Sequence, residues 1–189
     1  MEISVFTALM SALIGIIFGI IPGTFARFGL HFNAKIGLIF DVAKGAAACG
    51  SAYILGAGGF GMAVAGALAV FANNFSPFSR QHDVGISTAL GVALAINPLV
   101  AAVWTLMWAT GYGVIRRERI IGNLAGTLGT MALIWTTPTP LLQLTTIPPA
   151  TEPTQIVALT LIVCFQIFIR LIPQARRYFR SIKPDEAEE

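Results

Sequence analysis

The chain is poor in charge and in the residues that build metal sites or disulfide frameworks. Only 11% of its 189 residues are Asp, Glu, Lys or Arg, and it has two cysteines and two histidines. Cys49 and Cys164 both lie inside apolar runs, which is typical of small core residues rather than of a disulfide framework. No cysteine or carboxylate cluster accompanies His31 or His82, so we expect neither a metal site nor a metal cofactor.

Polar helix faces are also scarce. The chain is 56% hydrophobic with a mean hydropathy of +0.77, and apolar runs of about 20 residues recur. A soluble core of this size would need polar helix faces, so we predict an all-α integral membrane protein. The first run, 3–21, lacks a basic leader and a clear cleavage site, so we expect a retained helix rather than a signal peptide.

Breaks in the apolar pattern predict about seven transmembrane helices. Their expected ranges are 3–21, 36–55, 60–72, 85–96, 99–115, 120–135 and 154–172. Asn97-Pro98 separates the fourth from the fifth, because a residue before proline avoids the helical region. The third is rich in Ala and Gly and is expected inside the bundle. We therefore expect a polytopic transmembrane domain over 1–172, followed by a basic, then acidic cytoplasmic tail over 173–189.

The placement of Lys and Arg predicts the orientation. All 12 except Lys44 lie in the first, third or fifth expected loop, or at or beyond the end of the last helix. The other loops have none. The positive-inside rule then places the N-terminus outside and the C-terminus in the cytoplasm. We expect a multi-pass protein of the cell's inner (plasma) membrane.

A polar loop interrupts the apolar pattern between the third and fourth helices. Its polar residues are Asn73, Asn74, Ser76, Ser79, Arg80, Gln81, His82, Asp83, Ser87 and Thr88. Such a loop is costly beside a membrane unless it faces water or a polar ligand. At the start of the fourth helix, backbone N–H groups favour an anion, but capping by Ser or Thr explains the same residues and is the preferred interpretation. For His82-Asp83, a solvated histidine is preferred to an acid/base unit.

Asp41 and Lys44 lie three residues apart on one face of the second helix. Two interpretations stay open: an ion pair that fixes this helix in the bundle, or a cation aimed at a phosphate. Asn123 and Gln166 are expected to form hydrogen bonds between helices. The cationic loops also suit anionic lipid headgroups.

Three motifs together carry a resemblance to a known family. They are Asp-Val-Ala-Lys-Gly at 41–45, Asn-Phe-Ser-Pro-Phe at 74–78 and Gly-Ile-Ser-Thr-Ala-Leu-Gly at 85–91. With the short fourth helix and Asn97-Pro98, the chain resembles the bacterial acyl-phosphate:glycerol-3-phosphate acyltransferases, the PlsY family. The resemblance implies seven helices with the N-terminus outside, and transfer of a fatty acyl group from acyl phosphate to glycerol 3-phosphate. The product would be lysophosphatidic acid, in phospholipid biosynthesis. Its ligands would be membrane lipids and the two substrates, with no coenzyme A, metal or nucleic acid.

The resemblance also implies roles for residues. The expected catalytic group is Arg27, Lys44, Asn74, Ser76 and Thr88, in which the two cations neutralise phosphate charge and the other three form hydrogen bonds. The expected substrate-binding group is Asp41, Arg80, Gly85, Ser87 and Asn123.

The chain departs from the family pattern in places. Gln-His-Asp-Val-Gly at 81–85 replaces the family's Gly-Gly-Lys-Gly phosphate loop, and Asn73 replaces a histidine. The family's C-terminal His and Asn fall on Leu171 and Gln174. The alternative is therefore a catalytically inactive paralogue that binds lipid or is a subunit of a membrane protein complex. A small transporter fits less well, because the ionisable groups gather at one face rather than near the midplane.

Overall fold

The computed structural model describes residues 5–20, 34–75, 85–148 and 151–182, which are mostly helical and contain no strand. The elements are α1 (Val5–Ile20), α3 (Ala34–Ile54), α4 (Gly58–Phe75), α5 (Ile86–Ile96), α6 (Pro98–Thr110), the π-helix η1 (Gly111–Ile115), α7 (Arg119–Thr136), α8 (Thr139–Leu144) and α9 (Pro153–Ile182). A helix lies at each of the predicted positions, with η1 forming the end of the fifth. The prediction of an all-α chain is therefore confirmed.

Several of these helices suit a bilayer. Three described helices are long and apolar enough to cross a membrane: α4, the continuous α6–η1 helix and α9. The helices α1 and α5 are apolar but shorter. Helices of this composition are typical of a membrane protein. That the chain crosses the membrane seven times, with its N-terminus outside, stays a prediction.

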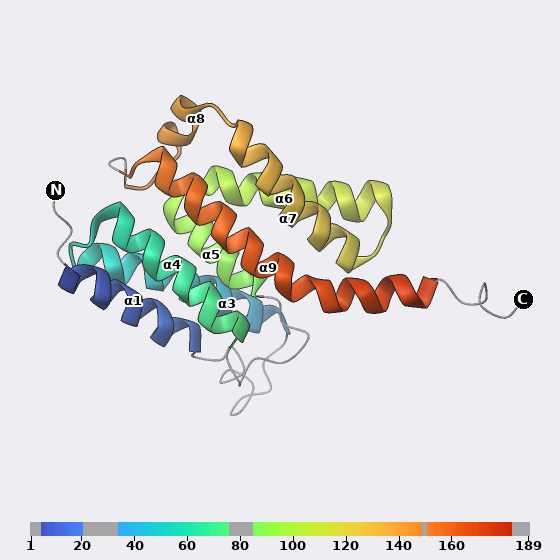
Figure 1. The fold of residues 1–189 in the computed structure, drawn as a ribbon, viewed down its shortest axis with the longest axis horizontal. Helices are drawn as coiled ribbons and strands as arrows, with labels where there is room; N and C mark the ends of the chain where they lie inside the picture. Colours follow the sequence, from blue (N-terminus) through green and yellow to red (C-terminus); the bar gives the residue numbers. More distant parts are fainter. Residues whose placement is uncertain (1–4, 21–33, 76–84, 149–150, 183–189) are drawn as a thin grey trace, which may run out of the picture.

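The helix α9 joins two groups of helices. On one side α4 packs against α1 and α3, and α3 packs against α5. On the other side α6 and α7 pack together. Because α9 contacts both α4 and α7, it holds the two groups together (Figure 1).

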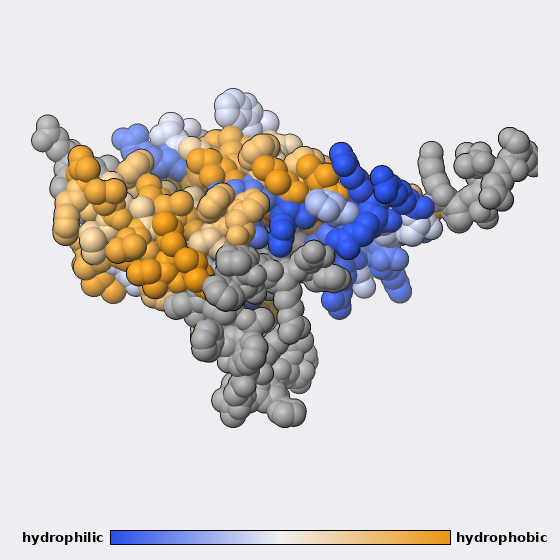
Figure 2. All heavy atoms as spheres, turned by 60° about the horizontal axis from the view of Figure 1, so that its bottom comes forward, coloured by the Kyte–Doolittle hydropathy of each residue, from blue (hydrophilic) through white to orange (hydrophobic). Residues whose placement is uncertain are grey.

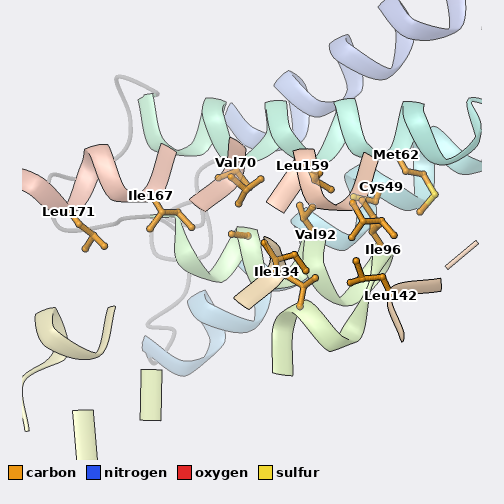
Figure 3. Close-up of a cluster of buried hydrophobic side chains, with 14 residues drawn as sticks. Cys49, Met62, Val70, Val92, Ile96, Ile134, Leu142, Leu159, Ile167 and Leu171 are labelled. Carbon is orange, nitrogen blue, oxygen red and sulfur yellow. The ribbon is translucent and has the colours of Figure 1, made fainter. Parts of the chain in front are cut away.

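The apolar core lies where α4, α5 and α9 meet. Val70, Val92, Ile96, Leu159 and Ile167 are all buried there and belong to one apolar cluster (Figure 3). Small residues bring the neighbouring backbones close. A Cβ on Gly15 of α1 would lie 3.0 Å from the Cα of Ala65 on α4. Such contacts are typical of helix packing in membranes, and they confirm that the Ala- and Gly-rich α4 lies inside the bundle.

The end of the last helix differs from the prediction. The range 154–172 was wrong at its C-terminal side, because α9 continues through Pro173 to Ile182. Proline removes one backbone hydrogen bond and bends a helix, and the arginines that follow are good helix formers. Figure 1 shows the C-terminal part of α9 turned away from the direction of its first part. Figure 2 shows hydrophilic side chains gathered around this end and an apolar surface over the opposite half.

Candidate functional site

A buried ion pair joins α3 to the end of α4. Lys44 Nζ lies 2.7 Å from Asp41 Oδ1, and it also donates a hydrogen bond to Asn73 Oδ1. The three residues are only 4%, 7% and 7% exposed, respectively. Because charges buried in this way require partners, the pair predicted from the spacing on α3 is confirmed. Asn73 is its third member, and only the packing of α4 on α3 brings it there.

Gly85 begins α5 beside this cluster. Its φ of 62° is left-handed, a conformation that glycine adopts without strain. A Cβ at this position would lie 3.0 Å from Asn73 Nδ2 and still closer to Asn74 Oδ1. The backbone therefore turns directly over the two side-chain amides, where only glycine fits.

The preferred interpretation of Ser87 and Thr88 as helix caps was wrong. Gly85 occupies the N-cap position, and no side chain caps α5 there. Because the helix begins at Ile86, both hydroxyl residues lie within its first turn, too late to cap it. Ser87 is half-buried and Thr88 is fully buried.

Two buried polar side chains next to Gly85 have no partner among the described residues. Asn74 and Thr88 are both 0% exposed. Neither the amide of Asn74 nor the hydroxyl of Thr88 forms a hydrogen bond there. Leaving such a group unpaired costs about 1–3 kcal/mol, so a polar ligand that paired it would gain a comparable amount.

These features together suit an anionic ligand. As in any helix, the first backbone N–H groups of α5 have no acceptor within the helix, and they lie beside the amide of Asn74 and the hydroxyl of Thr88. The carboxylate of Asp41 offsets the charge of Lys44. The cluster therefore offers hydrogen-bond donors more than net positive charge.

Not all of the predicted residues can be placed at this cluster. The structure brings together Asp41, Lys44, Asn74, Gly85, Ser87 and Thr88. Arg27, Ser76, Arg80, His31, His82 and Asp83 lie outside the described residues.

Asn123 belongs to a different part of the molecule. Its Oδ1 accepts a hydrogen bond of 3.0 Å from Trp108 Nε1, which confirms the predicted bond between helices. The helix α7 packs against α6, η1 and α9 rather than against α3, so Asn123 is separated from Lys44. For Gln166, the predicted bond is not found, because its Oε1 has no partner among the described residues.

A polar cavity that Asn123 lines was missed by the sequence analysis. It measures about 610 Å³ and is also lined by Tyr112, Arg117, Arg119 and Gln174. The rings of Trp108 and Tyr112 stack beside it with their centroids 5.1 Å apart. Its residues come from η1, α7 and the turn between them, and from α9, which is distant in sequence. The sequence therefore located its arginines in the fifth expected loop but could not predict that Gln174 approaches them.

An apolar cavity lies along one face of α5. It measures about 40 Å³ and lies between α5, α6 and α9. Ile86 and Ala89, which flank the buried Thr88 on α5, line one part of it, and Trp104 and Ile156 line others. The apolar cavity and Thr88 of the polar cluster therefore share the first turn of α5.

Comparison with known proteins agrees with these motifs. No solved structure matches the chain significantly. The family model described as glycerol-3-phosphate acyltransferase matches residues 24–181, which include the whole polar cluster and Asn123. The chain therefore belongs to the glycerol-3-phosphate acyltransferase family, the membrane acyltransferases of phospholipid biosynthesis that its motifs resemble.

Proposed function

We propose that this protein transfers a fatty acyl group from acyl phosphate to glycerol 3-phosphate and thereby forms lysophosphatidic acid. One observation carries the proposal beyond family membership. The amide of Asn74 and the hydroxyl of Thr88 are fully buried without a partner among the described residues, beside the Asp41–Lys44 pair. A reaction in which both substrates carry phosphate would supply acceptors for these donors.

The chemistry needs donors at two oxygens. A hydroxyl of glycerol 3-phosphate attacks the carbonyl carbon of the acyl phosphate, and a new ester C–O bond forms. The bond between the carbonyl carbon and the bridging oxygen breaks, so phosphate leaves with the electron pair, and the hydroxyl proton passes to this phosphate or to water. Negative charge grows on the carbonyl oxygen and on the leaving phosphate, so donors aimed at these oxygens accelerate the reaction.

We propose that residues of the cluster supply these donors. We place the leaving phosphate against the N–H groups of the first turn of α5 and the hydroxyl of Thr88, with Gly85 giving close access to the backbone. The Asn74 amide then donates to the carbonyl oxygen. Lys44 holds Asn73 in place, and its charge strengthens the site although Asp41 partly offsets it.

Further groups complete the proposal. Arg27 and Arg80 would supply the positive charge that the Asp41–Lys44 pair does not, and Ser76 and Ser87 would add hydrogen bonds. The fatty chain would leave the site along the apolar cavity that Ile86 and Ala89 line.

The test compares two buried threonines with the same substitution. Thr88 and Thr127 are both 0% exposed, and neither hydroxyl has a partner among the described residues, but Thr127 lies on α7, away from α3 and α5. The purified protein in lipid is given acyl phosphate and labelled glycerol 3-phosphate. We expect Thr88→Val to lower the rate about 10²-fold, as removal of one such donor commonly does, and Thr127→Val to leave it unchanged. Equal rates for the two variants would exclude Thr88 from the site.

A second candidate function rests on Leu171. This residue, on which the family's histidine falls, is 0% exposed and belongs to the apolar core, so it offers packing rather than a polar group. The alternative is a catalytically inactive paralogue that binds lipid or belongs to a membrane protein complex. Absence of product beside an active family member in the same assay would support it, and purification from native membranes would then reveal protein partners.

A further inference from the structure

An open groove lies between α7 and the C-terminal part of α9. It measures about 900 Å³, within the range of about 300–1,000 Å³ typical of ligand sites. Its apolar part includes Leu124, Phe168 and Ile172, and its other part includes Phe179, Arg176 and Arg180. No carboxylate lines it among the described residues.

The groove follows from the way α9 continues past Pro173. Ile172, Arg176, Phe179 and Arg180 are spaced by three and four residues, so they share one face of the helix. Arg177 lies off this face, and its Nε donates to the carbonyl oxygen of Pro173 at 3.4 Å. Figure 1 shows that the C-terminal part of α9 turns away from the direction of its first part. On this part, Phe179 and Ile182 stay 52% and 39% exposed.

The two parts of the groove differ in the chemistry that they accept. Phe168 and Ile172 lie before Pro173, on the membrane-spanning part of α9, whereas both arginines lie beyond it, where hydrophilic side chains gather (Figure 2). Phe179 is 52% exposed between the arginines. A purely apolar ligand would leave the guanidinium groups unpaired, and a small anion would leave the apolar part uncovered. An amphiphile with an anionic headgroup satisfies both parts.

We propose that this groove binds one anionic phospholipid of the surrounding leaflet. A fatty chain lies along Leu124, Phe168 and Ile172, and the phosphate receives paired hydrogen bonds from the guanidinium groups of Arg176 and Arg180. Basic grooves between membrane helices are known to recognise such headgroups. The site is separate from the Asp41–Lys44 cluster, so its test does not depend on acyl transfer.

The test uses the full chain reconstituted into vesicles that contain equal amounts of phosphatidylcholine and phosphatidylglycerol. The protein is extracted in mild detergent, and native mass spectrometry counts the lipids that remain bound. We expect one phosphatidylglycerol to be retained in preference to phosphatidylcholine. Arg180→Gln should weaken this retention about fivefold and the Arg176→Gln/Arg180→Gln double variant about 25-fold, given the usual contribution of each arginine near an anionic headgroup.

Arg177 provides a matched control. Arg177→Gln removes the same charge from the same turn of α9, but outside the groove, so retention should be unchanged. Ala175→Trp provides the complementary variant: it fills the groove, keeps every arginine and should abolish retention.

Three outcomes would overturn the proposal. Equal losses for Arg177→Gln and Arg180→Gln would mean that general surface charge attracts the lipid. Equal retention of the two lipids would mean that the headgroup is not recognised. A dimer that Ala175→Trp abolishes would mean that a second copy of the chain occupies the groove.

Discussion

Gly45 of α3 lies directly against the backbone carbonyl of Thr88 on α5. A Cβ on Gly45 would be 3.1 Å from the carbonyl carbon of Thr88, and a Cβ on Gly91 of α5 would be 2.8 Å from that of Val42 on α3. The two helices therefore meet backbone to backbone. This contact sets the distance between the turn of α3 that carries Lys44 and the first turn of α5.

Gly45→Ala should destabilise the protein and impair the site together. The added methyl group meets backbone on α5, which cannot move aside cheaply, so we expect a loss of about 1–3 kcal/mol in the free energy of unfolding. Gly50, on the same helix, is the control, because a Cβ there meets no described atom within 4 Å. Gly50→Ala should be neutral or stabilising by up to about 1 kcal/mol. Unfolding in detergent measures the stability of both variants. Equal free energies of unfolding for Gly45→Ala and Gly50→Ala would contradict the packing argument.

Breaking the Asp41–Lys44 pair should cost more than removing it. Asp41→Asn or Lys44→Met removes one member of the buried ion pair, and we expect each to lower the free energy of unfolding by about 3–5 kcal/mol. The Asp41→Asn/Lys44→Met double variant should be destabilised by less than the sum of the losses of the two single variants. A double-mutant cycle on unfolding measures this coupling.

The same variants separate the two interpretations of Lys44. If the pair only fixes α3, the double variant should keep acyl transfer wherever it is folded. If Lys44 also acts on phosphate, the folded double variant should lose the activity. The rate under saturating substrate, measured beside the unfolding curve, distinguishes these outcomes.

Asn97 should hold α8 and the segment after it. Its Oδ1 accepts from Leu99 N at 3.1 Å and caps α6, and its Nδ2 donates to Leu142 O at 3.0 Å and to Thr146 Oγ1 at 3.1 Å. Asn97→Ala removes these three hydrogen bonds and the cap of α6, so we expect a loss of about 1–3 kcal/mol and faster amide exchange over residues 139–148. Gln143→Ala, at an exposed position on α8, is the control and should change neither quantity. Unchanged exchange in Asn97→Ala would show that α8 is held by other contacts.

Cysteine labelling should test the orientation. Both native cysteines are buried, Cys49 at 0% and Cys164 at 4% exposed, so they should give little background with a membrane-impermeant maleimide. We expect Ser79→Cys to be labelled only from the cytoplasmic side and Thr139→Cys, exposed on α8, only from outside. Labelling of both from one side would contradict the predicted number of crossings between them.

Helix positions could be predicted from the sequence because their signals are local. Apolar runs, the Asn97-Pro98 break and the charged turn before Arg119 all act within a few residues. The end of α9 was missed because proline at position 173 has the same local signal whether it ends a helix or bends one. The hydroxyl cap was assigned wrongly because capping depends on which residue first adopts helical backbone angles. The left-handed turn at Gly85 makes Ile86 the first helical residue of α5.

The sequence by itself determined the class of the protein, since a chain so apolar must satisfy its backbone hydrogen bonds within helices. It also predicted the Asp41–Lys44 ion pair as one of two interpretations, because a spacing of three residues places both side chains on one face of a helix. Only the tertiary structure joined Lys44 to Asn73, placed Gly85 over Asn74 and separated Asn123 from that cluster. These relationships depend on how closely helices approach and how each is rotated about its axis, and both are fixed by packing between segments distant in sequence.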